Sequence, residues 1–182
     1  VSHVGSNVSN YLIGLPIFLL MIKKLLNGER RESKKLKIGT IIKLCLISVA
    51  GSWIFGCLGG GVEKVVGLLK GSEIIVSTGE LFQSSGSIVM LIFGGILAPI
   101  IEEFVFRKVL LDKIRPYGDK IAILITALLF GIFHGNLAQL IGATAGGLIY
   151  GYVTLKTGTI KYSIIMHMFN NITGSVIFPL LL

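Results

Sequence analysis

The chain has 182 residues, of which 53% are hydrophobic and 14% are charged, and its mean hydropathy is +0.85. Apolar runs long enough to cross a bilayer, for which about 20 residues suffice, recur along the sequence, and this composition excludes an ordinary soluble domain. The net charge of +8 does not indicate a nucleic-acid partner, because the basic residues gather in short loops between apolar runs, as membrane topology signals do.

Six apolar segments follow one another along the chain. They predict an all-α fold, a polytopic transmembrane helix bundle with about six membrane segments. In chain order we expect these segments at about 4–22, 38–60, 87–111, 121–135, 137–155 and 162–182. Residues 61–86 are mixed and rich in Ser and Gly, which predicts a loop with room for a short interfacial helix. Polar turns are predicted at 112–120, where Pro and Gly occur, and at 156–161.

The opening residues carry two separate signals. Val1 stands where a start Met would be expected, which predicts a fragment or a processed form. The apolar run 4–22 does not predict a signal peptide, because its basic residues follow the run instead of preceding it.

Charge is distributed unevenly over the loops. The basic clusters fall at 23–37, 107–120 and 156–161, and six crossings place all three on one side of the membrane. The acidic residues of the 61–86 loop then fall on the other side. The positive-inside rule makes the basic side cytoplasmic. We therefore predict a multi-pass protein of the cell membrane whose basic loops are cytoplasmic.

Two successive GxxxG spacings occur in the fifth segment, at Gly142–Gly146 and Gly147–Gly151. Small residues at this spacing let helix backbones approach closely in lipid. These glycines therefore predict tight helix packing and no chemistry.

The stretch APIIEEFVFRKVLL, residues 98–111, places ionisable side chains in an otherwise apolar segment. Glu103 and Arg107 have the i, i+4 spacing of neighbours on a helix, which predicts an internal ion pair. The alternative for Arg107 is to snorkel to the membrane interface. Glu102 has no such partner, since Arg107 is five residues away and on a different face of an α-helix. An unpaired carboxylate within a membrane segment is a functional candidate.

Two other apolar segments carry polar groups toward the same depth. At about 1.5 Å per residue, Glu102 and His134 both lie roughly 20 Å from the turn near Arg115, in a core of about 30 Å. His167 and Asn171 are one helical turn apart and share a face, but the same count places His167 at a shallower level. One such histidine alone is more often structural than catalytic. Two histidines together with Glu102 indicate a functional site.

These side chains fit three kinds of chemistry. In the first, a carboxylate and an imidazole take a proton from water, while a second imidazole and an amide stabilise the oxyanion of a scissile carbonyl. In the second, two histidines and one glutamate bind zinc and the second glutamate acts as base, although the chain has no HExxH. The third is a proton or ion pathway. Serine catalysis lacks its GxSxG signature.

Three short motifs in this order resemble a known family. EEFVFR (102–107) is similar to EExxxR, FGIFH (130–134) to FxxxH, and HMFNN (167–171) to HxxxN. Together they resemble the CPBP family, the CAAX protease and bacteriocin-processing (Abi) family of intramembrane endopeptidases. The stretch GGLIYGYVTLKTGTIKYSIIMHMFNN also looks like the last two core helices of that family. The resemblance covers about 90 to 175. It divides the chain into N-terminal membrane segments with their connecting loops (1–86) and a CPBP catalytic core (87–182).

The resemblance implies a role for each motif residue. Glu102 would be the general base and would work with His134 on the attacking water. His167 and Asn171 would form the oxyanion site. The last two motif residues would brace the helix that carries the base; they are Glu103 and Arg107. The family's mechanism needs no obligatory metal, so no cofactor is expected; the alternative is zinc bound by Glu102, His134 and His167.

Residues and resemblance together predict an intramembrane endopeptidase. Its partners would be the lipid bilayer and a membrane-associated peptide or protein, of the CAAX type or from bacteriocin, pheromone or signalling pathways. The alternative is a non-enzymatic membrane protein for bacteriocin immunity or proton-coupled transport. The short N-terminal part departs from the family pattern, so helices that help to admit substrate are expected to be missing from this chain.

Overall fold

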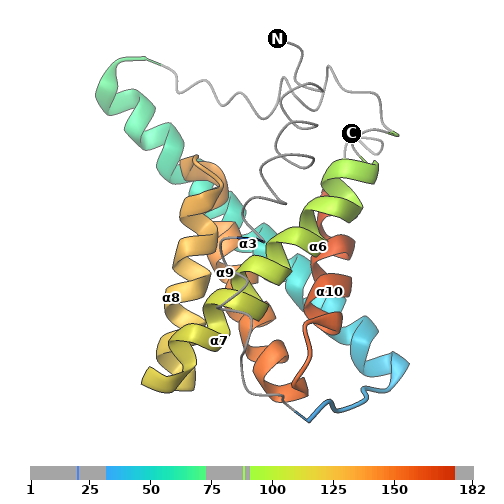
Figure 1. Cartoon of the computed structure of the whole chain (residues 1–182). Helices are drawn as coiled ribbons and strands as arrows, with labels where there is room; N and C mark the ends of the chain where they lie inside the picture. Colours follow the sequence, from blue (N-terminus) through green and yellow to red (C-terminus); the bar gives the residue numbers. More distant parts are fainter. Residues whose placement is uncertain (1–19, 21–31, 73–87, 89–90, 175–182) are drawn as a thin grey trace. The chain divides into compact units, whose positions relative to one another are not determined.

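The computed structural model describes residues 20, 32–72, 88 and 91–174, and every element within these ranges is a helix (Figure 1). The all-α prediction is therefore confirmed for this part of the chain. The first predicted segment and the end of the sixth lie outside the described residues. In chain order the helices are α3 (Ile38–Lys70), η3 (Leu91–Leu97), α6 (Ala98–Glu103), η4 (Phe104–Leu110), α7 (Leu111–Ile114), η5 (Arg115–Tyr117), α8 (Asp119–Phe133), α9 (Leu137–Thr157) and α10 (Lys161–Ile172).

Helix α3 is longer than the sequence pattern predicts. It continues through the glycines at 59–61 to Lys70, so the first part of the predicted 61–86 loop is helical. It ends at Gly71, whose φ of +71° is a left-handed conformation that glycine adopts without strain. Among the described helices, α3 is the one long and apolar enough to cross a membrane by those two criteria alone. The number of membrane crossings therefore stays a prediction.

The third predicted segment is a continuous helical run that alternates between α and π geometry. Two π-helical stretches, η3 and η4, flank the six-residue α6. A π-helix closes i→i+5 hydrogen bonds, takes more residues per turn and advances less per residue than an α-helix, and such turns are frequent at functional sites. The run continues through α7 and η5 to Tyr117, so much of the polar turn predicted at 112–120 is helical. The turn itself is Gly118, with φ +121°, before α8 begins at Asp119.

Helix α9 packs against α3, α8 and α10. It begins where the Asn136 side chain accepts a hydrogen bond from the backbone N–H of Gln139 (2.8 Å). A Cβ at Gly142 would lie 2.8 Å from the Ser52 carbonyl oxygen of α3, and a Cβ at Gly147 would lie 3.0 Å from Ala127 Cα of α8. The packing role predicted for these glycines is thus confirmed: the fifth segment needs them to approach two neighbours at once.

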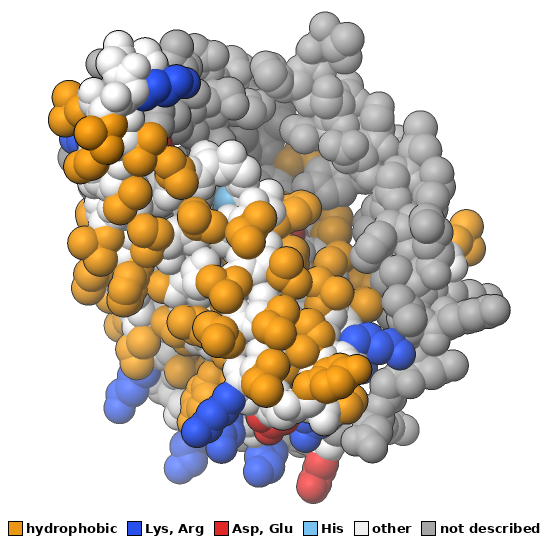
Figure 2. Space-filling view, turned by 90° about the vertical axis from the view of Figure 1, so that its left-hand side faces the viewer, with side chains coloured by type: hydrophobic (Ala, Val, Ile, Leu, Met, Phe, Trp, Pro, Cys, Tyr) orange, Lys and Arg blue, Asp and Glu red, His pale blue; other side chains and the backbone are white. Residues whose placement is uncertain are grey.

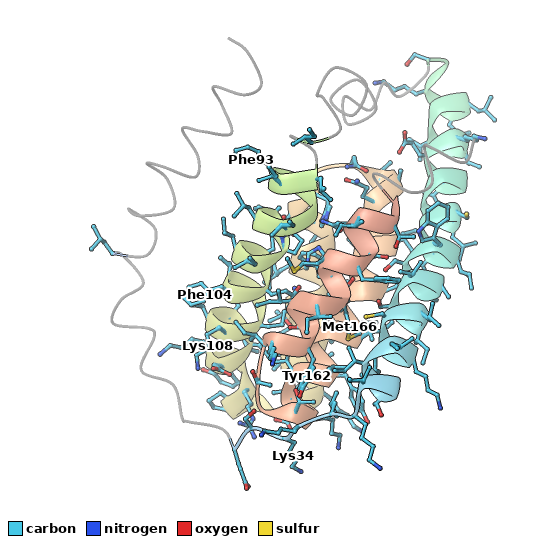
Figure 3. All side chains as sticks on the ribbon, turned by 90° about the vertical axis from the view of Figure 1, so that its right-hand side faces the viewer. Lys34, Phe93, Phe104, Lys108, Tyr162 and Met166 are labelled. Atoms are coloured by element: carbon cyan, nitrogen blue, oxygen red, sulfur yellow. The ribbon has the colours of Figure 1, made fainter. Side chains whose placement is uncertain are left out.

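Helix α10 lies between α3 and the π-containing run, as Figure 3 shows. Phe93, Phe104 and Lys108 mark that run in Figure 3, and Tyr162 and Met166 mark α10 beside it. Met166 is fully buried, so the face of α10 that carries it packs against the neighbouring helices. This arrangement brings α6 and α10 together, although about sixty residues separate them in sequence.

The outer surface is strongly apolar. Hydrophobic side chains cover much of the face shown in Figure 2, and Lys and Arg side chains gather along its lower edge. Large exposed hydrophobic side chains line both α3 and α8, including Ile54, Leu58, Leu128 and Ile132. A surface of this kind is stable in lipid and would be a liability in water.

Candidate active site

The second carboxylate of the motif lies in the interior. Glu103 ends α6, and its side chain is fully buried, as is that of Arg107 in η4. Glu103 Oε1 lies 3.2 Å from Arg107 Nη1, so the structure contains the predicted ion pair. Arg107 Nη2 also donates to the Gly147 carbonyl (3.3 Å), and its guanidinium lies 4.4 Å from the centre of the Phe130 ring. A buried charge pair needs such additional partners because it has left water.

His167 contacts both carboxylates of the motif. Its Nδ1 lies 3.0 Å from Glu103 Oε1, and its Nε2 lies 3.7 Å from Glu102 Oε2. An ionised carboxylate can only accept a hydrogen bond. The Nδ1 of His167 must therefore carry the proton that it donates to Glu103. Glu103 therefore has His167 as a partner as well as Arg107, the partner that the sequence indicated. The i, i+4 spacing reveals local partners only, and His167 comes from a distant helix.

The depth count made His167 shallower than Glu102, yet the structure places them side by side. The count assumed the rise of an α-helix throughout. Seven residues of η4 separate Glu102 from the turn near Arg115, and they are π-helical and advance less per residue. Glu102 therefore lies somewhat nearer that turn than the count implied, although seven π-helical residues account for only a small part of the mismatch.

Two aromatic rings hold the imidazole of His167. Tyr150, from α9, is stacked on it with ring centres 5.2 Å apart and an interplanar angle of 22°. Phe130, from α8, meets it edge-on with centres 5.3 Å apart. Tyr150 is 1% exposed and was not singled out from the sequence, because an aromatic residue in an apolar helix is usually part of the core.

His134 caps the C-terminal end of α8. Its Nδ1 lies 2.8 Å from the carbonyl oxygen of Phe130, so Nδ1 donates and Nε2 is left as the acceptor. Its ring also packs edge-on against Phe130, with ring centres 4.9 Å apart. The Glu102 side chain is 19% exposed, and both His134 and His167 are close enough to interact electrostatically with its carboxylate. The structure thus brings together the carboxylate and the two histidines singled out from the sequence.

Asn171 lies one turn beyond His167 on the same side of α10. Its Nδ2 donates to the carbonyl oxygen of Gly94 in η3 (2.9 Å), a contact that the sequence did not predict. An amide nitrogen carries two N–H groups, so one remains for another acceptor. The bond also ties α10 to the π-helical start of the run that carries Glu102.

A cavity of about 450 Å³ opens beside these groups. His134, His167 and Asn171 all line it, and Tyr150 and Phe130 contribute to the same wall. No group of three or more His, Cys, Asp or Glu side chains within the described ranges could hold a metal ion. Zinc ligation by Glu102, His134 and His167 would therefore require these side chains to move.

Comparison with known proteins agrees with this arrangement. The family model described as "Type II CAAX prenyl endopeptidase Rce1-like" matches residues 84–173, a range that includes all three motifs. A relative from Bacillus subtilis (strain 168), named "Putative membrane peptidase YdiL", is 28% identical over 170 residues, which make up 91% of this chain and 68% of the relative. Both similarities support the CPBP family for the part of the chain that carries the three motifs. No solved structure matches it significantly.

The description of the matched family and the name of the relative both support a membrane protease. The three CPBP motifs contribute the end of α6, the end of α8 and the middle of α10. His134, His167 and Asn171, from the second and third motifs, line the cavity, and Glu102 of the first motif reaches His167 with an Oε2–Nε2 distance of 3.7 Å.

Proposed function

We propose that the chain is an intramembrane endopeptidase that hydrolyses a peptide bond with a water molecule activated by Glu102 and His134. The observation that carries this proposal is the position of Glu102, whose Oε2 lies 3.7 Å from His167 Nε2 next to the cavity lined by both histidines. A carboxylate in such a place can take a proton from water at the moment of attack.

The proposed steps follow from the proton positions. His134 donates through Nδ1 to Phe130, so its Nε2 accepts a hydrogen bond from the water and orients it. Glu102 accepts the other water proton while the water oxygen attacks the carbonyl carbon. The C–N bond then breaks, and the leaving nitrogen takes the proton from Glu102. Glu102 thus acts first as a base and then as an acid, and it ends the reaction in its starting protonation state.

Two N–H groups would stabilise the oxyanion of the tetrahedral intermediate. One is the second amide N–H of Asn171, which the bond to Gly94 leaves available. The other is the Nε2–H of a protonated His167. The two carboxylates and Arg107 carry a net charge of −1, and protonated His167 makes this buried group neutral. Donors aimed at developing charge in a site with little water contribute strongly to catalysis.

The proposed substrate is a membrane-associated peptide or protein. The catalytic groups lie among helices with apolar outer faces, so the scissile bond must reach them from the bilayer or its surface. The matched family description names CAAX prenyl endopeptidases, and a CAAX-type protein is therefore one candidate substrate. A bacteriocin or pheromone precursor, or a signalling protein, is another. The proposed location is the cell membrane, with several crossings and cytoplasmic basic loops.

The test is the cleavage of a quenched peptide library by the purified chain reconstituted in lipid vesicles, with and without a metal chelator. We expect cleavage in both conditions and its loss in His134→Ala. Cleavage that stops with the chelator and returns with zinc would replace the glutamate mechanism with the zinc alternative. Equal signals from wild type and His134→Ala would contradict the protease proposal. The immunity or transport alternative would then be favoured.

Tyr150 is expected to hold the orientation of His167. Tyr150→Phe keeps the flat ring and should retain cleavage within about twofold, because stacking needs no hydroxyl. Tyr150→Leu removes the flat face, and we expect kcat to fall about two- to tenfold with little change in KM, since a stacked pair contributes roughly 0.5–1.5 kcal/mol. The measurement is steady-state cleavage, normalised to folded protein.

The matched control for this prediction is Tyr152→Leu. Tyr152 is on the same helix but is 55% exposed, and its ring lies 5.6 Å from Lys156 Nζ instead of a histidine. We expect no change in kcat for this variant. Equal losses in Tyr150→Phe and Tyr150→Leu would show that the hydroxyl, and not the ring face, is what matters.

A further inference from the structure

The cavity extends beyond the catalytic side chains to a wall made by α3. Ser52, Trp53, Gly56 and Cys57 of α3 line it, together with the histidines and with the first half of α9, which contacts α3 at Gly142. Helix α3 lies outside residues 84–173, the part of the chain that matches the family model. One wall of the cavity therefore comes from a helix without any of the three catalytic motifs.

The chemistry of this wall is uncharged. Within the described part of the chain, the lining of the cavity includes no Asp, Glu, Lys or Arg side chain. Its polar groups outside the motif residues are uncharged and include the hydroxyl and amide groups of Ser52, Gln139 and Asn170. Moving an unpaired charge into such a space is costly, whereas an uncharged side chain or a peptide backbone can be accommodated.

The α3 wall is also fixed in place. Glu63 accepts a hydrogen bond from the backbone N–H of Ala138 at the start of α9 (3.0 Å). At Gly59 an added Cβ would collide with the carbonyl oxygen of Ala138, so the two backbones are in direct contact there. The wall therefore has a defined distance from the catalytic groups, which a specificity-determining surface needs.

Gly56 leaves space on this wall. It lines the cavity, and a Cβ added there would meet no atom within 4 Å, apart from its chain neighbours and the backbone of its own helix. Gly60, one turn later on α3, has the same freedom but does not line the cavity. A larger residue at 56 would therefore occupy open space at the cavity wall without displacing a neighbouring side chain.

We infer that the α3 wall around Gly56 is the subsite for a substrate side chain near the scissile bond, and that it selects an uncharged residue whose size is limited by the space over Gly56. This inference rests on the proposed endopeptidase function and deepens it. It assigns specificity to α3, while the motif helices carry the reaction.

The experiment uses a peptide that the reconstituted wild-type chain cleaves. Each residue within three positions of the scissile bond is changed in turn to Ala, Leu, Asp or Lys. We expect one position at which Ala and Leu are both accepted and both Asp and Lys are rejected. Cleavage that tolerates charge at every position would overturn the inference while leaving the proposed protease function intact.

The variants Gly56→Leu and Gly60→Leu then locate that position on α3. Gly56→Leu should lower kcat/KM for the Leu peptide about 10- to 200-fold relative to the Ala peptide, the usual range for a steric change in an apolar pocket. Gly60→Leu should leave the ratio of the two peptides unchanged. An unchanged ratio in Gly56→Leu, or equal effects of both variants, would overturn the assignment. Absence of cleavage by wild type would instead count against the proposed function.

Discussion

Glu102→Gln is expected to abolish nearly all peptide cleavage while leaving the fold intact. The substitution keeps the size of the side chain but removes its ability to accept a proton from water. A positioned general base contributes about 10²- to 10⁴-fold to a reaction rate, and kcat should fall by about that factor. The Glu102 side chain is 19% exposed and lies 3.7 Å from His167 Nε2, whereas the fully buried Glu103–Arg107 pair is 3.2 Å apart, so neutralising Glu102 should cost less stability than breaking that pair. The measurement is the single-turnover rate in reconstituted vesicles.

The control for this prediction is Asp112→Asn. Asp112 lies further along the same helical run, and its carboxylate, 11% exposed, pairs with Lys108, which is 40% exposed (3.3 Å). Its replacement should change the cleavage rate less than twofold, normalised to folded protein, because Asp112 lies ten residues from Glu102 and has no part in the proposed reaction. A Glu102→Gln variant with wild-type activity would contradict the proposed mechanism. The carboxylate that activates water would then have to be sought elsewhere.

The sequence predicted those parts of the site that depend on local spacing. The Glu103–Arg107 pair follows from i, i+4 geometry, and the structure contains it. The position of His167 and Asn171 on one face of α10 follows from the same periodicity, and both residues line the cavity. The close packing at Gly142 and Gly147 follows from the small residues themselves. Local geometry is fixed by the helix, so the sequence suffices for it.

Contacts between distant helices could not be predicted in the same way. His167 contacts both carboxylates from a helix about sixty residues away, and no residue in FVFRKVL signals the π-helical geometry beside them. The stacking of Tyr150 on His167 and the bond from Asn171 to Gly94 also join helices far apart in sequence. These contacts depend on tertiary packing, which overrides the regular α-helix that hydropathy alone suggests.

The length of α3 also differs from the sequence prediction, and this difference has a physical reason. Gly59, Gly60 and Gly61 interrupt the apolar pattern, and glycine lowers helix propensity by about 1 kcal/mol. The structure keeps the helix through them because Gly59 is needed for the contact with α9 at Ala138. The glycines that interrupt the apolar pattern thus mark a packing site. The cavity wall around Gly56 is part of the same continuous helix.

Arg107→Met is expected to cause the largest loss of stability. It would leave the Glu103 carboxylate buried with His167 as its remaining ion-pair partner. Removal of one member of a buried pair costs about 3–5 kcal/mol. We expect unfolding in mixed detergent micelles, followed by the loss of helical circular dichroism, at a much lower denaturant concentration. Lys108→Met is the matched control, since Lys108 is 40% exposed and its pair should contribute less than about 1 kcal/mol.

The double variant Glu103→Leu/Arg107→Met separates stability from catalysis. Replacing both members of a buried pair with apolar side chains is often neutral or stabilising, so the double variant should regain most of the stability lost in Arg107→Met. Cleavage should remain low, because His167 Nδ1 loses the carboxylate that orients the imidazole toward Glu102. A double variant that regains activity would show that Glu103 stabilises the helix without orienting His167. One that stays as unstable as Arg107→Met would show that the Gly147 and Phe130 contacts of Arg107, and not its charge pair, hold this part of the fold together.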